Sequence, residues 1–308
     1  MPIPLSRSSL ARIGSFIGVG IGIAGLAFVV RILTSKWTEV TDAFAQVDAA
    51  NLVFSLILGL SGMTIIGSLW VAMLASRSQH MRHRTALSWY FTGQLGKYVP
   101  GGIWPIVGRA EFAVRNSVPR VDAYASTGLS LVSTYLAAIV AIALGALLTD
   151  DHQLIGISLS IALVIGYLAF ANERLRLKVI TVATRISPVA QSLTDPIRLA
   201  KLVLMHLPAW ILMSLSTSVT ASALGARIGI AEMLFITSTS WFFGFVVVGV
   251  PGGIGVREAV FTSMAGGIIG VPVAVSLALL SRVVFIAVDV SGAFVSTVVA
   301  RSSRSVKS

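Results

Sequence analysis

Six long apolar segments alternate with short polar stretches along the chain. They cover residues 13–34, 51–75, 124–149, 154–171, 200–223 and 274–299. Each is close to the roughly 20 residues that a helix needs to cross the hydrocarbon core of a bilayer, and a helix satisfies its own backbone hydrogen bonds there. The pattern predicts an all-α integral membrane protein with six transmembrane helices.

Two further apolar regions, residues 85–112 and 232–270, are each interrupted by Pro-Gly-Gly. Proline ends a helix, and paired glycines allow dihedral angles and close approaches that other residues resist. We interpret each region as a re-entrant helical hairpin that turns at the tripeptide and leaves the membrane on the side where it entered. The alternative is that 232–270 crosses twice, which gives eight spans. It is less favoured because residues 256–270 are short for a crossing and open on a charged Arg-Glu pair.

The chain also contains an internal repeat. The sequence VPGGI at residues 99–103 recurs unchanged at residues 250–254, 151 residues later. The spans on either side of the first copy have counterparts on either side of the second, at about the same offset. An odd number of crossings separates corresponding spans, so the two repeats are expected to be inserted in opposite orientations. Inverted repeats with broken helices near the midplane are a recurring plan of secondary transporters.

The repeat suggests a division of the chain into four parts. Residues 1–171 hold the first repeat together with 154–171, the first span of the second repeat. A cytoplasmic linker is expected at 172–199, the rest of the second repeat at 200–299, and a cytoplasmic tail at 300–308.

Positive charges are distributed unevenly between the loops. If the N-terminus is cytoplasmic, the inner loops hold sixteen lysines and arginines and the outer loops hold only Lys36 and Arg227. By the positive-inside rule both termini are expected to face the cytoplasm, in the cytoplasmic membrane. The net charge of +11 therefore follows from membrane topology, and we expect no nucleic acid partner.

The composition excludes a soluble globule. Only 11% of the residues are charged and 56% are hydrophobic, whereas soluble domains carry roughly 25% charged residues. The absence of cysteine removes disulfides, thiolate nucleophiles and cysteine-ligated metals. The chain has no HExxH sequence, nucleophile elbow or aspartate-rich metal motif, so neither enzymatic activity nor a metal or other cofactor is expected.

Charged residues accompany both Pro-Gly-Gly motifs and the last span. A charge at the bilayer centre costs roughly 2.5 to 3.5 kcal/mol, so it is rarely placed there without a partner or a watery path. The helix that leaves each tip also presents free N–H groups and the positive end of its dipole, which favours an anion. The predicted substrate-binding residues are Lys97, Pro100, Gly101, Gly102, Arg109, Glu111, Pro251, Gly252, Gly253, Arg257, Glu258, Arg282 and Asp289.

Two other interpretations of residues near the motifs stay open. In the first, Arg109 pairs with Glu111, Arg257 with Glu258, and Arg282 with Asp289, merely to hold the halves together. The second concerns the aromatic residues, which can line a route for a sugar or acyl chain, although anchoring at the membrane interface is the more usual role. These aromatic residues are Trp89, Tyr90, Tyr98, Trp104, Trp241, Phe242 and Phe243.

The two motifs in their context support a family assignment. Residues 93–104, GQLGKYVPGGIW, and residues 250–259, VPGGIGVREA, resemble the flippase-like family related to the transmembrane region of lysylphosphatidylglycerol synthase. The resemblance implies an integral membrane protein that moves a lipid, or a lipid-linked precursor, between leaflets. Members that synthesise aminoacyl lipids carry a large soluble transferase domain, whereas this chain ends at Ser308 just after its last span, so synthase activity is not expected.

The sequence therefore predicts a lipid flippase for a phosphate-bearing lipid, either an anionic lipid or one linked to polyprenyl phosphate. Lys97, Arg109, Arg257 and Arg282 are expected to bind the phosphate. Glu111, Glu258 and Asp289 are expected to neutralise these cations in the empty site or to carry a coupled proton. The alternative is a membrane partner of a cell-envelope glycosyltransferase or lipid-modifying enzyme that transports nothing.

Overall fold

The computed structural model describes residues 30–31, 34–35, 37–45, 47–76, 81–99, 103–184, 195–247 and 251–305. The regular structure of these residues is entirely helical. The predicted span at 13–34 lies almost wholly outside the described residues. So do Pro100, Gly101 and Gly102 of the first motif, and residues 185–194 of the predicted linker.

Five helices in the described part of the chain are long and apolar enough to cross a membrane. They are α3 (Ala49–Ala75), α6 (Arg120–Leu147), α7 (Gln153–Ala171), α9 (Pro196–Ala223) and α12 (Val271–Ser305). They coincide with the five predicted spans that the described residues contain. This confirms the prediction of an all-α integral membrane protein.

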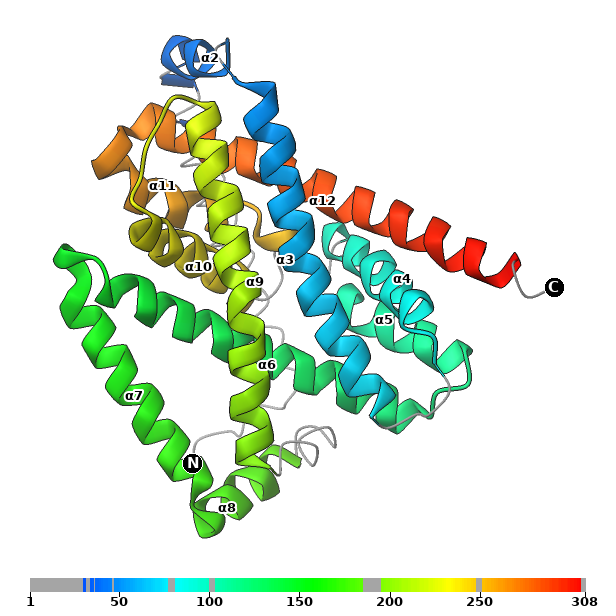
Figure 1. The fold of residues 1–308 in the computed structure, drawn as a ribbon. Helices are drawn as coiled ribbons and strands as arrows, with labels where there is room; N and C mark the ends of the chain where they lie inside the picture. Colours follow the sequence, from blue (N-terminus) through cyan, green and yellow to red (C-terminus); the bar gives the residue numbers. More distant parts are fainter. Residues whose placement is uncertain are drawn as a thin grey trace, which may run out of the picture.

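The two apolar regions that carry the motifs form helical hairpins (Figure 1). In the first hairpin, α4 (His83–Gln94) leads through a short 3-10 helix η1 (Leu95–Tyr98) to α5 (Trp104–Arg115). In the second, α10 (Ile230–Val246) leads through η4 (Pro251–Gly253) to α11 (Val256–Ile269). A helix rises 1.5 Å per residue. The 12-residue helices α4 and α5 are thus about 18 Å long, too short to cross roughly 30 Å of hydrocarbon.

Helices α3 and α9, which correspond in the two repeats, run antiparallel side by side (Figure 1). At one end, the backbone N–H of Asp48 donates to the carbonyl oxygen of Ala223 over 3.1 Å. At the other, the guanidinium of Arg198 donates to the hydroxyl of Ser76 over 3.0 Å. The pair approaches closely because small residues line the contact: a Cβ on Gly62 would lie 3.0 Å from a backbone oxygen of α9. Their antiparallel direction is the one expected for inverted repeats.

Each long helix that follows a hairpin packs against both hairpins. Helix α6 contacts α5 of its own repeat and α10 of the other, and α12 contacts α11 of its own repeat and α4 of the other. The contact between α6 and α10 depends on Gly145, where a Cβ would meet the backbone nitrogen of Phe235 at 2.5 Å. This exchange of partners ties the two repeats into one helical bundle.

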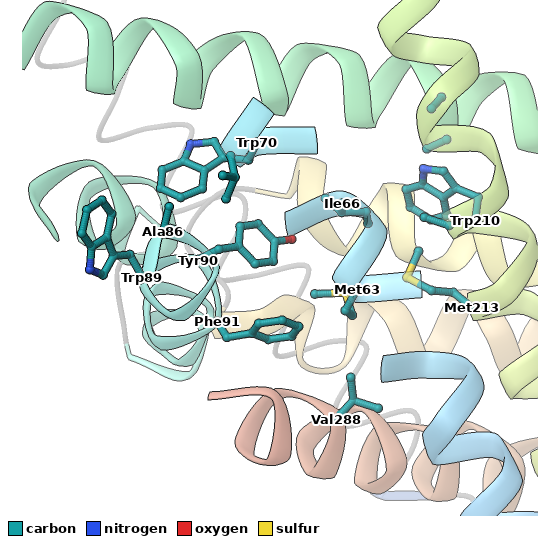
Figure 2. Close-up of a cluster of buried hydrophobic side chains, with 14 of the residues drawn as sticks. Met63, Ile66, Trp70, Ala86, Trp89, Tyr90, Phe91, Trp210, Met213 and Val288 are labelled. Atoms are coloured by element: carbon teal, nitrogen blue, oxygen red, sulfur yellow. The ribbon is translucent and has the colours of Figure 1, made fainter. Parts of the chain in front are cut away.

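The largest apolar core lies where α3, α4, α9 and α12 meet (Figure 2). It contains the fully buried rings of Trp70, Tyr90, Phe91 and Trp210. Helix α7, by contrast, is apolar but almost completely exposed in the protein, which suits a helix that faces lipid. Three short elements complete the fold: α2 (Trp37–Ala45), η2 (Asp150–His152) and α8 (Glu173–Thr184).

Candidate functional site

The broken segments of the two hairpins touch each other. The 3-10 helix η1 of the first hairpin packs against η4 of the second. A Cβ built on Gly252 would lie 3.5 Å from the carbonyl oxygen of Lys97. The second turn and the 3-10 helix that precedes the first motif are therefore in contact through these residues.

Glycine is required at the second turn because the backbone adopts left-handed dihedrals. The φ angles of Gly252, Gly253 and Gly255 are 56°, 69° and 82°, a region that residues with a Cβ adopt only under strain. The dihedral freedom expected of the second Pro-Gly-Gly motif is thus confirmed.

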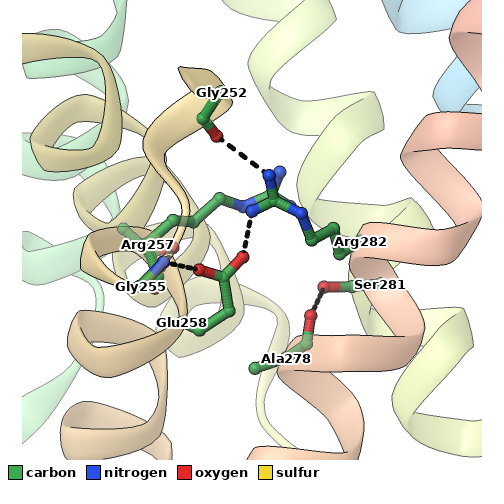
Figure 3. A network of polar contacts seen from close by, with 8 residues as sticks. Gly252, Gly255, Arg257, Glu258, Ala278, Ser281 and Arg282 are labelled. Atoms are coloured by element: carbon green, nitrogen blue, oxygen red, sulfur yellow. Dashed lines mark hydrogen bonds and ion pairs between the residues drawn. The ribbon is translucent and has the colours of Figure 1, made fainter. Parts of the chain in front are cut away.

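Glu258 and Arg282 fasten this turn to the last helix (Figure 3). One carboxylate oxygen of Glu258 accepts the backbone N–H of Gly255 over 2.7 Å, and the other pairs with the guanidinium of Arg282. The same guanidinium donates to the carbonyl oxygen of Gly252 over 3.4 Å. The sequence predicted free N–H groups at the start of α11. One of the N–H groups there, that of Gly255, is capped by the chain's own carboxylate.

The first turn is fastened to the last helix by a second ion pair. The ammonium of Lys97 lies 2.6 Å from Oδ2 of Asp289, and the hydroxyl of Tyr98 donates to the same oxygen over 2.5 Å. Asp289 is only 1% exposed. This contact joins the two repeats, since Lys97 belongs to the first and Asp289 to the second.

The described residues form none of the three ion pairs Arg109–Glu111, Arg257–Glu258 and Arg282–Asp289. Successive helical residues are about 100° apart, so Arg109 and Glu111 face nearly opposite sides of α5. Glu111 instead pairs with Arg120 at 3.0 Å and accepts the hydroxyl of Tyr124 at 2.6 Å. The structure therefore does not bring Glu111 to the other predicted site residues, and this pair is partly exposed at the start of α6.

Arg109 and Arg257 have no carboxylate partner within ion-pair distance among the described residues. Each guanidinium instead lies near aromatic rings of the protein. Arg109 is 5.5 Å from the centre of the Tyr90 ring, and Arg257 is 3.9 Å from that of Trp241. The rings attract the cations by a cation–π interaction but carry no negative charge with which either arginine could form an ion pair. Arg109 is 6% exposed, and its Nε is buried without a hydrogen-bond partner.

The environments of these two arginines repeat along the chain. Tyr90 and Trp241 are 151 residues apart, as are Gly93 and Gly244, which is the offset of the two VPGGI sequences. A Cβ on Gly93 would lie 3.0 Å from the Cβ of Arg109, and one on Gly244 would lie 3.1 Å from the Cβ of Arg257. In each hairpin, a glycine of the first helix thus lets an arginine of the second helix approach it. Arg109 and Arg257 are structural counterparts.

Sequence reasoning missed the role of these aromatic residues. It favoured interfacial anchoring for Tyr90 and Trp241, whereas both are buried, at 1% and 4% exposure, and lie beside the unpaired arginines. The signal was present in the sequence, because the two aromatic positions share the offset of the motif. The arginines themselves did not reveal this correspondence, because Arg109 and Arg257 are 148 residues apart and so do not share the offset of 151.

An open cavity lies beside the two turns, and its empty space of about 1320 Å³ includes open solvent. Lys97 and Arg109 contribute its positive charge, and Gly252 and Gly253 bring the second turn into its wall. The rest of its lining is largely apolar and aromatic. A smaller hollow of about 360 Å³ adjoins it, with Lys97, Arg257 and Arg282 in its wall, and Lys97 and Trp241 line both spaces. The arrangement suits an anionic group attached to an apolar body.

Comparison with known families gives a match over most of the chain. Residues 15–290 match the model of the lysylphosphatidylglycerol synthase TM region, and a search of curated proteins finds no match. The matched range includes both hairpins and every charged residue placed at the two turns. The family identifies a multi-pass, lipid-related membrane protein of the cell envelope. The chain belongs to the family of the lysylphosphatidylglycerol synthase TM region.

Proposed function

We propose that this protein is a flippase that moves a phosphate-bearing lipid, or a lipid-linked precursor, between the two leaflets of the cytoplasmic membrane. The observation that carries the proposal is that two cations, Arg109 and Arg257, form no ion pair among the described residues and lie beside the adjoining spaces at the contact of the two hairpins. A buried charge without a partner is costly in a membrane. A bound phosphate group would supply the missing negative charge.

In the proposed mechanism, the headgroup enters the cavity while its hydrocarbon tails remain in lipid. Arg109, Arg257 and Lys97 contact the phosphate. Arg282 is engaged by Glu258 and by the carbonyl of Gly252, so its role is to hold the second turn in position. Rocking of one repeat against the other then exposes the headgroup to the opposite side, as in other transporters built from inverted repeats.

This mechanism places the two hairpins in the membrane as re-entrant elements that enter from opposite sides. Two observations support it: the short helices of the first hairpin and the antiparallel direction of α3 and α9. The distribution of lysines and arginines between the loops supports an orientation with both termini in the cytoplasm.

The test is a headgroup-accessibility assay in proteoliposomes. Purified protein is reconstituted with trace amounts of labelled aminoacyl phosphatidylglycerol, polyprenyl phosphate or a polyprenyl-phosphate sugar, and loss of label to a membrane-impermeant reagent is followed in time. We expect one class to become accessible faster than in protein-free liposomes. If none of the three moves, and the protein instead copurifies stoichiometrically with an envelope enzyme, a non-transporting partner replaces the flippase.

A further inference from the structure

The buried carboxylate of Asp289 lies at the contact of the two repeats, and the ammonium of Lys97 balances its negative charge. Asp289 is 1% exposed, and its Oδ2 accepts both Lys97, at 2.6 Å, and Tyr98, at 2.5 Å. Its Oδ1 is buried and has no hydrogen-bond partner. Of the described groups that touch this carboxylate, only Lys97 carries a positive charge to balance it.

Lys97 also lines both of the spaces where the proposed headgroup binds. The phosphate of a headgroup would compete with Asp289 for this ammonium, since both are oxyanions and both form charge-assisted hydrogen bonds with it. If the phosphate takes Lys97 together with Arg257, which it also contacts in the proposed mechanism, Asp289 becomes a buried carboxylate without a counter-charge. Such a group binds a proton, because burial disfavours its charged form.

The other charged and titratable groups around Asp289 are already engaged. On α12 itself, Arg282 is paired with Glu258 of α11. From the same α11, Arg257 lies over the ring of Trp241 and, in the proposed mechanism, binds the phosphate together with Lys97. The Tyr90 hydroxyl of α4 accepts a hydrogen bond from Gln94.

The remaining helices that pack on α12 offer no replacement cation at this point. Helix α3 contains no titratable residue. On α9, His206 is hydrogen-bonded to the carbonyl of Leu202, and Arg198 binds Ser76 near the far end of α3. Asp42 of α2 is exposed. A proton is therefore the simplest replacement for the charge of Lys97.

We propose that Asp289 is a proton-binding site coupled to the headgroup site through Lys97; this inference rests on the proposed lipid transport. When the phosphate takes the ammonium, a proton from water joins the Asp289 carboxylate and leaves a neutral carboxylic acid. When the headgroup departs, that proton returns to water and the ion pair re-forms. Because binding linkage is reciprocal, lipid and proton move together, towards the side of higher pH.

The first test needs no lipid. The Lys97→Gln variant removes the ammonium permanently, so its infrared spectrum at pH 7 should contain the C=O band of a protonated carboxylic acid that the wild type lacks. The band should disappear in Lys97→Gln/Asp289→Asn. It should persist in Lys97→Gln/Asp150→Asn, in which an exposed turn carboxylate is neutralised instead. Absence of the band from Lys97→Gln would overturn the proposal.

The second test adds the lipid. Short-chain phosphatidylglycerol is a clean probe because its phosphodiester stays singly charged near neutral pH. Added to wild-type protein in detergent, it should produce the same infrared band, and the band should be lost in Asp289→Asn. If Lys97→Gln shows the band but the probe does not produce it in the wild type, the headgroup does not displace Lys97 and the coupling is wrong.

A transport assay distinguishes an error in this inference from an error in the proposed function. In proteoliposomes with a pH gradient, movement of the transported lipid towards the higher-pH side should accelerate by up to tenfold per pH unit, as expected for one linked proton. Asp289→Asn should lose this dependence. If lipid movement by the wild type does not depend on the pH gradient, the proton coupling is wrong but the proposed flippase function is unaffected. Failure of every lipid to move would reject the flippase itself.

Discussion

The backbone of Gly253 lies directly against the backbone of Gly244. A Cβ built on Gly253 would approach the carbonyl oxygen of Gly244 to 2.7 Å and its Cα to 2.8 Å. This contact holds the second turn against α10. It also keeps Gly244 beside Arg257, so it helps to fix the position of one of the two unpaired cations.

The Gly253→Ala substitution should therefore destabilise the second hairpin. A left-handed backbone costs a residue with a Cβ about 1 to 2 kcal/mol, and the clash with Gly244 adds to that cost. We expect a lower thermal unfolding midpoint of the detergent-solubilised protein. Gly267→Ala is the matched control, because a Cβ there meets nothing within 4 Å and alanine favours a helix. Equal midpoints for the two variants would contradict the contact.

The helices could be predicted from the sequence because length and hydrophobicity act locally. A long apolar run satisfies its backbone only as a helix in lipid, and the repeated VPGGI sequence marked both breaks. The partners of the charged residues could not be predicted in the same way. Asp289 binds Tyr98, 191 residues away in the chain, and the choice depends on how α12 crosses the first hairpin.

Whether a candidate residue lies at the site depends on which face of its helix carries the side chain. Glu111 was expected at the site but faces α6 and Arg120, because it lies about 200° around α5 from Arg109. For Tyr90 and Trp241, interfacial anchoring was favoured over lining a substrate route, yet they lie beside the arginines of the site. Aromatic residues are common both at interfaces and in cores, so their type alone did not distinguish the two roles.

If the two hairpins enter from opposite sides of the membrane, residues at their ends should be accessible to a labelling reagent from opposite sides. The native chain has no cysteine, so single cysteines can be introduced without background. With an impermeant maleimide on oriented membranes, Arg84→Cys and Asn116→Cys, at the ends of the first hairpin, should label from one side. Arg227→Cys and Val271→Cys, at the ends of the second, should label from the other. All four positions are exposed. Labelling of all four from the same side would be incompatible with inverted repeats.

The ring of Trp241 should matter for transport because it holds Arg257. A desolvated cation–π contact contributes up to about 2 kcal/mol. We expect Trp241→Leu to slow lipid movement roughly five- to thirtyfold, which corresponds to about 1 to 2 kcal/mol, whereas Trp241→Phe, which keeps an aromatic face, should stay within a few-fold of the wild type. Trp37→Leu serves as the control, because Trp37 is 61% exposed on α2. Initial rates in the accessibility assay measure the effect, and equal slowing by Trp241→Leu and Trp241→Phe would argue against it.

The central claim is that Arg109 and Arg257 bind the phosphate of a lipid that the protein moves between leaflets. The most direct measurement compares headgroup accessibility in proteoliposomes that contain wild-type protein, Arg109→Gln, Arg257→Gln or the exposed-loop control Arg227→Gln, at equal reconstituted amounts. We expect the first two variants to lose transport while folding and inserting normally, and Arg227→Gln to match the wild type. Normal transport by both Arg109→Gln and Arg257→Gln would contradict the claim.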